Sequence, residues 1–321
     1  MSEIFEKIWP MEGERADHYV ARLAKGALSR AQVHEALEKG LVVLRGRRLQ
    51  KGAKLTAADA SDLEDRGLAE LIAMGKSGAT ADESVALDVV YEDEALVGVN
   101  KPAGMPVQPL RADERGTLVG ALLARYPEMA GIGGDTLCPA VVHRIDIETS
   151  GLVLAARLGR AYRALRTEFK RFRVEKHYLA VVAGKVVAEG RSDAPLVHAT
   201  RVPCRMRLAR PGESEGDDGK RVFPASTAWV PMGYDAEKDW SLLDVTIVTG
   251  VTHQIRCHLA AAGHSIVGDG IYGGQQVNAE SRAGRKGQWL HSWKASFAHP
   301  GSGEACEIVA PPPAGFWRMG E

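Results

Sequence analysis

The sequence contains only four cysteines, Cys138, Cys204, Cys257 and Cys306, and no two of them form a C-x-x-C pair. Their scatter argues against a disulfide framework and against a zinc site built on paired cysteines. The chain also lacks an apolar run of about 18 residues, the length that marks a transmembrane helix. Residues 1–13 lack the apolar core of a signal peptide. We therefore expect a cytoplasmic protein with no membrane partner.

An excess of one charge is absent as well, because 41 Lys and Arg residues balance 41 Asp and Glu residues. The distribution is nevertheless uneven, since residues 15–54 carry ten basic and only three acidic side chains. A basic segment of this kind is typical of a surface that contacts the phosphate backbone of a nucleic acid. The alternative is an ordinary solvated basic face.

The chain divides into three segments by composition. In residues 14–65, apolar residues at helical spacing precede the apolar run 41–44, which predicts a compact helix-helix-strand unit. Residues 66–84 contain a short apolar patch and then small polar residues, which predicts a linker. In residues 85–312, strand-like and helical patterns follow one another without strict alternation. That irregularity favours an α+β fold with a mixed sheet over a doubly wound one.

One helical pattern, at residues 160–173, combines an apolar face with many basic side chains. Tyr162, Leu165, Phe169 and Phe172 recur at a spacing that places them on one face of a helix. Most of the remaining positions are basic: Arg160, Arg163, Arg166, Lys170, Arg171 and Arg173. Such a helix would suit an RNA partner, and a solvated cationic face is again the alternative.

The most informative segment is residues 143–151, His-Arg-Ile-Asp-Ile-Glu-Thr-Ser-Gly. It concentrates an imidazole, a guanidinium, two carboxylates and two hydroxyls between the apolar runs 141–142 and 152–156. A polar loop held between two strand-like segments presents its side chains at a fixed geometry. Taken alone, the segment is equally compatible with a polar turn that ends at Ser150-Gly151.

This nonapeptide resembles the active-site loop of the RluA-type pseudouridine synthases, His-Arg-Leu-Asp-x-x-Thr-Ser-Gly. Four further motifs resemble that family in the same order. They comprise residues 91–94 with 100–105, residues 176–180, residues 249–259 with 268–269 and 272–273, and residues 289–292. Five motifs spread in order over residues 85–312 argue strongly against a chance match.

The resemblance implies an RNA pseudouridine synthase, an isomerase that needs no cofactor and no metal. It implies an α+β catalytic domain at 85–312 with a mixed, mainly antiparallel central sheet and flanking helices. Residues 14–65 resemble a small S-four-like α/β RNA-binding domain, although the usual Val-Asn-Gly strand end is here Leu44-Arg45-Gly46. Family members with such a domain often act on large-subunit ribosomal RNA, which is the expected partner. Transfer RNA stays open as the alternative, and we expect a monomer.

Three catalytic residues follow from the resemblance. Asp146 is expected to act at the ribose, either as a covalent nucleophile or as a base that removes a proton. The alternative is an aspartate that only caps a turn. Arg256 is expected to be the buried ion partner that keeps Asp146 ionised and oriented. Tyr178 is expected to stack on the uracil that has left the helix; a core tyrosine is the alternative.

Four more residues are expected to bind the substrate. Arg144 would hold the target nucleotide out of the RNA helix, where stacking and pairing would otherwise hide it. Leu290 would pack beneath the base, as any buried strand leucine could. His143 and Thr149 belong to the same nonapeptide and are expected to contribute to the binding site.

Other functions fit the residues less well. A non-catalytic RNA-binding ribosome-assembly protein would not need Asp146 together with Tyr178 and Arg256. A hydrolase using Asp146 with His143 would need a Ser or Cys nucleophile or a second essential carboxylate, and none is apparent. His253 and His258 are five residues apart, not four as in a helical zinc pair.

The sequence departs from the family pattern at two places. Val251 stands where the arginine-bearing motif normally has a second Arg, which removes one possible phosphate contact. Ile147-Glu148 replaces the common Lys-Asp pair after the catalytic Asp and lowers the local positive charge. Both changes put the substrate preference in doubt, but neither affects the three expected catalytic residues.

Overall fold

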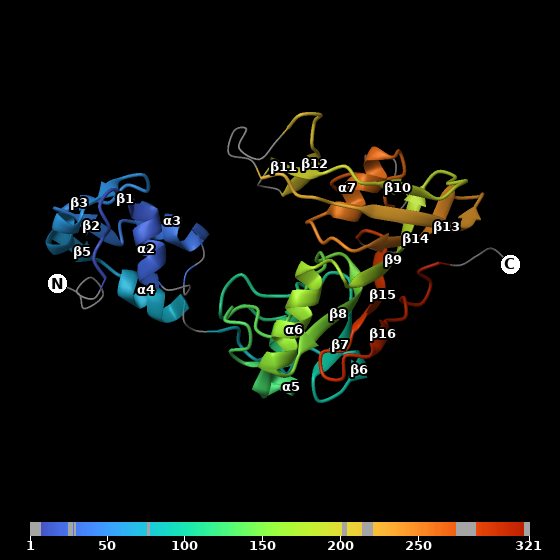
Figure 1. Ribbon diagram of the computed structural model, residues 1–321, viewed down its shortest axis with the longest axis horizontal. Helices are drawn as coiled ribbons and strands as arrows, with labels where there is room; N and C mark the ends of the chain where they lie inside the picture. Colours follow the sequence, from blue (N-terminus) through green and yellow to red (C-terminus); the bar gives the residue numbers. More distant parts are fainter. Residues whose placement is uncertain are drawn as a thin grey trace. The chain divides into compact units, whose positions relative to one another are not determined.

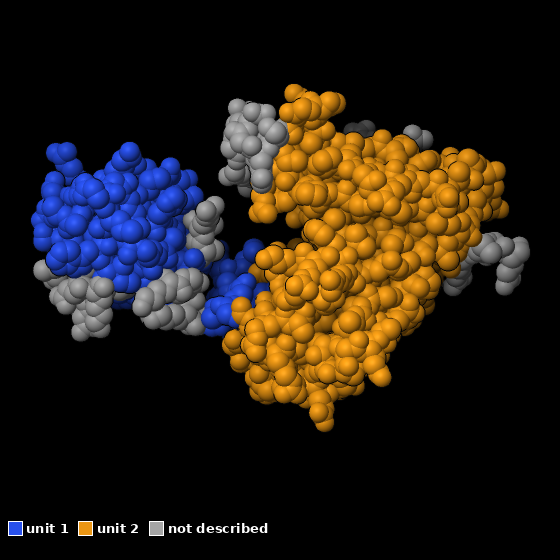
Figure 2. All heavy atoms as spheres, viewed as in Figure 1, with its two compact units in different colours: residues 1–80, 109–114, 134–139 blue, residues 81–108, 115–133, 140–321 orange. Residues whose placement is uncertain are grey.

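The computed structural model describes residues 8–24, 28, 30–75, 78–200, 204–213, 221–273 and 287–317. The contacts divide the chain into two compact units, shown in different colours in Figure 2. The first unit contains residues 1–80, 109–114 and 134–139, and the second contains residues 81–108, 115–133 and 140–321. Each unit is described separately.

The first unit consists of short strands and helices. Its elements are β1 (Glu14–Arg15), α2 (Ala16–Ala24), α3 (Arg30–Glu38), β2 (Val42–Leu44), β3 (Arg47–Arg48), β4 (Lys54–Leu55), η1 (Ala57–Asp62), β5 (Leu63–Asp65) and α4 (Leu68–Gly75). The predicted order of helix, helix and strand is therefore present in α2, α3 and β2. The helices bury Tyr19, Val20 and Leu37 in one hydrophobic core with Val42 of β2.

The first unit extends beyond residue 65, where the sequence suggested that a linker begins. Residues 68–75 form α4, and Leu68 and Ile72 of this helix belong to the same core as Tyr19. The Asp65 carboxylate accepts the N–H groups of Gly67 and Leu68 and so starts the helix. The assignment of residues 14–65 to an RNA-binding domain and of 85–312 to a catalytic domain stays a prediction.

The second unit has an α+β fold, as predicted. Its elements are β6 (Val89–Glu92), β7 (Leu96–Lys101), α5 (Leu118–Arg125), η2 (Pro127–Met129), β8 (Ser150–Ala156), α6 (Gly159–Lys170), β9 (Glu175–Ala183), β10 (Gly190–Ser192), β11 (Leu196–Thr200), β12 (Arg205–Leu208), β13 (Thr227–Asp235), β14 (Trp240–Ile247), α7 (Gln254–Ala261), β15 (Leu290–Ala298) and β16 (Ala305–Val309).

A nine-stranded sheet organises this unit within the described residues. The strand order is β10-β13-β14-β9-β15-β8-β7-β6, and β16 pairs with β15. The β8–β15 pair is parallel, and the other pairs of this sheet are antiparallel. Figure 1 shows α6 beside β8 and α7 beside β13, which the contacts confirm. The sheet is thus mixed and mainly antiparallel, as expected.

The central strand β9 separates two hydrophobic clusters. Tyr178, Ala180 and Val182 lie in the cluster that also contains the apolar residues of α7. Leu179 and Val181 lie in a second, tryptophan-rich cluster. Side chains alternate between the faces of a strand, so this two-residue period assigns Tyr178 to the face that α7 covers.

The start of β8 and the start of β15 approach each other closely. Gly151 has a φ of 109°, and a Cβ atom at this position would overlap the backbone of Ser292. Ser150 Oγ is 2.9 Å from His291 Nδ1 across the same parallel pair. Glycine is therefore required at the end of the nonapeptide, because no side chain fits between these strands.

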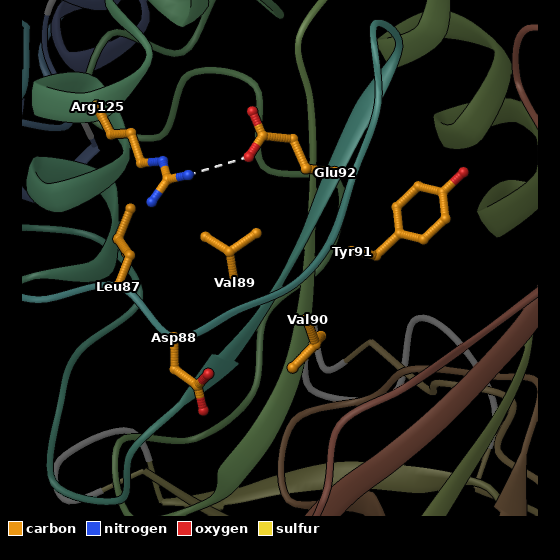
Figure 3. A pocket seen from close by; sticks show the side chains of 7 residues that line it. All are labelled: Leu87, Asp88, Val89, Val90, Tyr91, Glu92 and Arg125. Carbon is orange, nitrogen blue, oxygen red and sulfur yellow. Dashed lines mark hydrogen bonds and ion pairs between the residues drawn. The ribbon is translucent and has the colours of Figure 1, made fainter.

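The sheet ends at the edge strand β6. An open hollow at this edge is lined by residues 87–92 and by Arg125 of α5. Arg125 Nη2 and Glu92 Oε2 lie 3.1 Å apart within it (Figure 3). None of the seven residues proposed for the active site or for substrate binding lines this hollow.

Within the described ranges, no helix combines the length and the apolar character that crossing a membrane requires.

Replacing Gly151 by alanine tests the close approach of β8 and β15. The new Cβ would meet Ser292 at a φ that L-residues avoid, so we expect G151A to lose at least about 3 kcal/mol of unfolding free energy. Gly116 is the matched control, because it also has a positive φ of 75° but has nothing within 4 Å of the Cβ position. Urea unfolding should show a much smaller loss for G116A, and equal losses for the two variants would contradict the steric argument.

Candidate active site

The polar segment 143–151 forms a turn that leaves the Asp146 carboxylate available. The Thr149 N–H donates to the Asp146 carbonyl oxygen at 3.1 Å, which closes the turn. The Asp146 side chain instead accepts a hydrogen bond from Arg256 Nη1 at 2.7 Å and remains 28% exposed. The segment is therefore a turn, but the Asp146 carboxylate is not needed to stabilise it.

Arg256 is held by a second carboxylate, Asp269. Arg256 Nε lies 2.7 Å from Asp269 Oδ2, and Arg256 Nη2 lies 2.9 Å from Asp269 Oδ1. The Asp269 side chain is completely buried and that of Arg256 nearly so. Burial opposes ionisation of Asp269, but the hydrogen bonds and charge of Arg256, together with two backbone N–H groups, outweigh it and lower the pKa of this carboxyl group. This two-point contact fixes the guanidinium plane and aims its remaining edge at Asp146.

The start of α7 places Arg256. His253 precedes the helix with a φ of 54°, in the left-handed region. The Gln254 side chain then accepts hydrogen bonds from the Val251 N–H at 3.1 Å and from Thr249 Oγ1 at 2.9 Å. The backbone of Val251, not its side chain, makes this contact, so valine in place of the family's arginine leaves the start of α7 intact.

Tyr178 and Leu290 lie in the same hydrophobic cluster, although they come from β9 and β15. Ile145 and Ile255, the sequence neighbours of Asp146 and Arg256, belong to this cluster too. Burial raises the pKa of Tyr178 to about 12, and the negative charge of Asp146 adds to the rise. The phenol therefore keeps its proton at neutral pH, and it lies in apolar surroundings next to the carboxylate.

Lys101 holds the turn through a hydrogen bond to the backbone of Ile147 and was not among the expected site residues. It is fully buried at the end of β7, and its Nζ donates to the carbonyl oxygens of Pro102, Met105 and Ile147 at 2.8, 2.8 and 3.0 Å. Burial lowers the pKa of Lys101 to about 8. The motif at 100–105 was recognised in the sequence, but only the fold brings it against residue 147.

His253 and Tyr272 also reach the site without having been expected there. His253 Nε2 lies 3.9 Å from Asp146 Oδ2, and its Nδ1 lies 3.2 Å from the Tyr272 hydroxyl. Burial lowers the pKa of His253, which favours a neutral ring at pH 7. The Arg256 guanidinium carbon is 5.3 Å from the centre of the Tyr272 ring. The sequence marked His253 only as a weak metal candidate.

Arg144 and Thr149 occupy different positions around the turn. Arg144 is exposed and donates through Nη1 to Gln108 Oε1. Thr149 is buried and accepts a hydrogen bond from Gln288 Nε2 through its hydroxyl. Arg144 is thus at the surface, whereas Thr149 anchors the turn to the segment before β15.

The structure places His143 away from this group. Its Nε2 accepts the Leu154 N–H at 3.0 Å, and its ring stacks on Phe169 of α6 with a centroid distance of 5.1 Å. Burial lowers the pKa of His143 to about 3, so the ring is neutral. The side-chain contacts of Asp146 are instead with Arg256 and His253, so the described residues give no support to the Asp146–His143 pair of a hydrolase.

His143 should make stability depend on pH. Its pKa is about 3 in the folded protein and about 6.5 when unfolded. The unfolded chain therefore binds an extra proton between these values, so the unfolding free energy decreases as the pH is lowered from about 6.5 towards 3, by at most about 1.4 kcal/mol per pH unit. H143Q retains an acceptor but does not titrate. Urea unfolding at pH 7 and pH 5 should show wild type losing more stability than H143Q, whereas a pH-independent difference would contradict the assignment.

Asp269 should matter more for stability than a carboxylate in a comparable surface ion pair. Removing its charge in D269N leaves the buried Arg256 with Asp146 alone, and we expect a loss of about 3–5 kcal/mol in unfolding free energy. Asp193 is the matched control, because it also contacts an arginine Nε, of Arg191, with both oxygens but is 58% exposed. D193N should unfold like wild type in urea. Equal effects of D193N and D269N would refute the proposed importance of burial.

Comparison with known proteins places this site in a family. Residues 95–261 match the family model described as RNA pseudouridylate synthase. An RNA pseudouridine synthase of Chloroflexus aurantiacus is 40% identical over 94% of this chain and 87% of its own. Two proteins named ribosomal large subunit pseudouridine synthase D are similar as well. The one from Zymomonas mobilis is 35% identical over 72% of this chain and 71% of its own. The one from Xanthomonas campestris is 33% identical over 96% of this chain and 88% of its own.

The fold agrees with these sequence matches. The solved structure of human RNA pseudouridylate synthase domain containing 1 superposes with a TM-score of 0.54 and 28% identity, covering 71% of this chain and 84% of that one. The match to the family model covers about half of the chain, and the similarity to the relatives extends over nearly all of it. The chain therefore belongs to the RluA-type family of RNA pseudouridine synthases.

Proposed function

We propose that this isomerase converts specific uridines of large-subunit ribosomal RNA to pseudouridine and that Asp146 is its catalytic carboxylate. The observation that carries the proposal is the geometry of Asp146, which is partly exposed but fixed by Arg256 at 2.7 Å. A carboxylate that is both held and accessible can react with a substrate without reorganising. The names of the relatives in Zymomonas mobilis and Xanthomonas campestris support the choice of RNA.

The reaction breaks the bond between N1 of uracil and C1′ of ribose, turns the base, and joins C5 to C1′. The proton on C5 is lost and N1 gains one, so atoms and electrons balance without a cofactor. Asp146 can attack C1′ and form a covalent intermediate, or it can remove a proton from the sugar. The site suits both routes, because each needs one ionised carboxylate at the ribose.

The detached uracil must stay in the site while it turns. Tyr178 and Leu290 provide the apolar walls that would hold it, and the phenol keeps its proton at neutral pH. Tyr178 would therefore stack on the base and donate rather than accept a hydrogen bond. Exclusion of water from this cluster would protect the intermediate while the glycosidic bond is open.

The remaining residues would bind the RNA around the target. Arg144 is exposed on the turn that carries Asp146, where its charge can hold a nucleotide that has left the helix. In the first unit, Arg47, Arg48, Lys51 and Lys54 are exposed on and beside β3 and β4. We infer that these basic residues dock RNA through its phosphates, as an S-four-like domain would.

Mapping pseudouridines in cells that lack the protein tests the proposed function. We expect at least one pseudouridine to disappear from large-subunit ribosomal RNA and to return when wild type is supplied. D146N should not restore it, because loss of the nucleophile or base should slow the reaction by at least about 100-fold. Glu148 is the matched control, an exposed carboxylate in the same turn, and E148Q should restore the site.

Three outcomes would count against the proposal. Persistence of every site in ribosomal RNA, with loss of a site in transfer RNA, would move the substrate to transfer RNA. Persistence of every site in all RNA would overturn the assigned activity in the cell. Full restoration by D146N would remove Asp146 from the catalytic role while leaving the family assignment unchanged.

A further inference from the structure

The last turn of α6 ends in a backbone conformation that normally requires glycine. The Arg173 N–H donates to the Glu168 carbonyl oxygen at 3.0 Å, and the Phe172 N–H donates to the Phe169 carbonyl oxygen at 3.2 Å. This pair of hydrogen bonds is a Schellman motif, whose residue after the C-cap is left-handed. Here that residue is Phe172, with a φ of 56°.

A phenylalanine at this position costs stability. The left-handed conformation brings Cβ against the backbone, at a cost that glycine avoids. Tyr162, Leu165 and Phe169 of α6 belong to the hydrophobic cluster beneath the helix. Phe172 does not, and 53% of it is exposed. The sequence predicted that Phe172 would share the apolar face with these residues, and this was wrong because the helix ends at Lys170. Folding alone thus gives no reason for an aromatic ring here.

The surroundings of Phe172 are strongly basic. We define the Phe172 patch as this ring with the four exposed basic residues around the end of α6: Arg166, Lys170, Arg171 and Arg173. One acidic residue, Glu168, lies within the same turns, and its Oε1 is 3.8 Å from Arg173 Nη1. An exposed aromatic ring among arginines is the combination that binds unpaired nucleotides, because bases stack on the ring while phosphates contact the cations.

The Phe172 patch adjoins the segment that carries Asp146. Arg166 Nη1 donates to the Val142 carbonyl oxygen at 2.9 Å, and the His143 ring stacks on Phe169. Both contacts tie the C-terminal half of α6 to the residues directly before Arg144. A nucleotide strand that places its uridine at Asp146 would therefore reach the end of α6 with neighbouring nucleotides.

We propose that the Phe172 patch docks the RNA substrate and that the Phe172 ring stacks on an unpaired base flanking the target uridine. This inference rests on the proposed function, because the partner is the RNA whose uridine reacts at Asp146. RNA is favoured as the partner by the charge of the patch and by its continuity with the active-site turn. The ring is 53% exposed and so is accessible to a base.

The test compares F172G with wild type in the full-length protein. Glycine relieves the backbone and removes the ring, so the unfolding temperature should stay the same or rise. The dissociation constant for a fluorescently labelled transcript of large-subunit ribosomal RNA should increase about tenfold or more. The single-turnover rate at saturating enzyme should stay near that of wild type.

Asparagine at position 172 also tolerates the left-handed conformation, so F172N should behave like F172G. F172W keeps an aromatic ring and should bind the transcript like wild type. Val187 is 81% exposed and outside the patch, and V187A should bind RNA like wild type.

Each result decides the inference. Unchanged binding by both F172G and F172N would overturn it, and so would a clear fall in their unfolding temperature, which would assign the ring a structural role. Pseudouridine formation by wild type in the same transcript separates the two proposals. If wild type modifies the transcript and F172G binds it equally well, only the docking role of Phe172 fails. If wild type binds the transcript without modifying it, the proposed substrate fails, and the binding ratio still decides the role of the patch.

Discussion

The structure depends on one guanidinium shared between two carboxylates. Arg256 contacts the buried Asp269 at two points and the partly exposed Asp146 at one. The buried pair is neutral as a unit, which makes its burial tolerable. It leaves Nη1 of Arg256 to donate to Asp146, the carboxylate at the surface. The position of the Asp146 carboxylate is thus set by a contact between Arg256 and Asp269 that solvent scarcely reaches. Salt and water, which weaken exposed ion pairs, have little access to it.

The sheet brings this ion pair together from distant parts of the chain. Asp146 lies just before β8, whereas Arg256 lies on α7 and Asp269 on the loop that follows. The parallel contact between β8 and β15 fixes the turn, and Lys101 joins the same turn to the end of β7 through backbone carbonyls. A buried cation that satisfies carbonyl groups stiffens a loop without adding an acceptor that would compete for Arg256.

Among the described residues, two of the five non-glycine residues with a positive φ adjoin the helices α6 and α7. His253 before α7 and Phe172 after α6 both have a positive φ without being glycine. His253 thereby faces Asp146, and Phe172 is turned outward among basic side chains. Strain in residues of this kind persists where the surroundings hold it, and at Phe172 it coincides with the surface that we propose docks RNA.

The sequence alone determined the family and the mixed α+β fold, and it singled out the segment that carries Asp146, the carboxylate proposed to be catalytic. It also located a strand at residues 152–156 and a helix beginning near residue 160, because strand-like and helical patterns are local properties. It did not show that residues 68–75 belong to the first core, nor that α6 ends before Phe172, because a short apolar patch and a helical period do not mark where packing begins or ends. The positions of Lys101 and His253 beside Asp146 could likewise not be read from the sequence.

Arg256 and Asp146 are 110 residues apart, and their contact follows from the register of the strands between them. Only the tertiary structure could decide such contacts, because one residue of register shift turns every side chain of a strand to the other face.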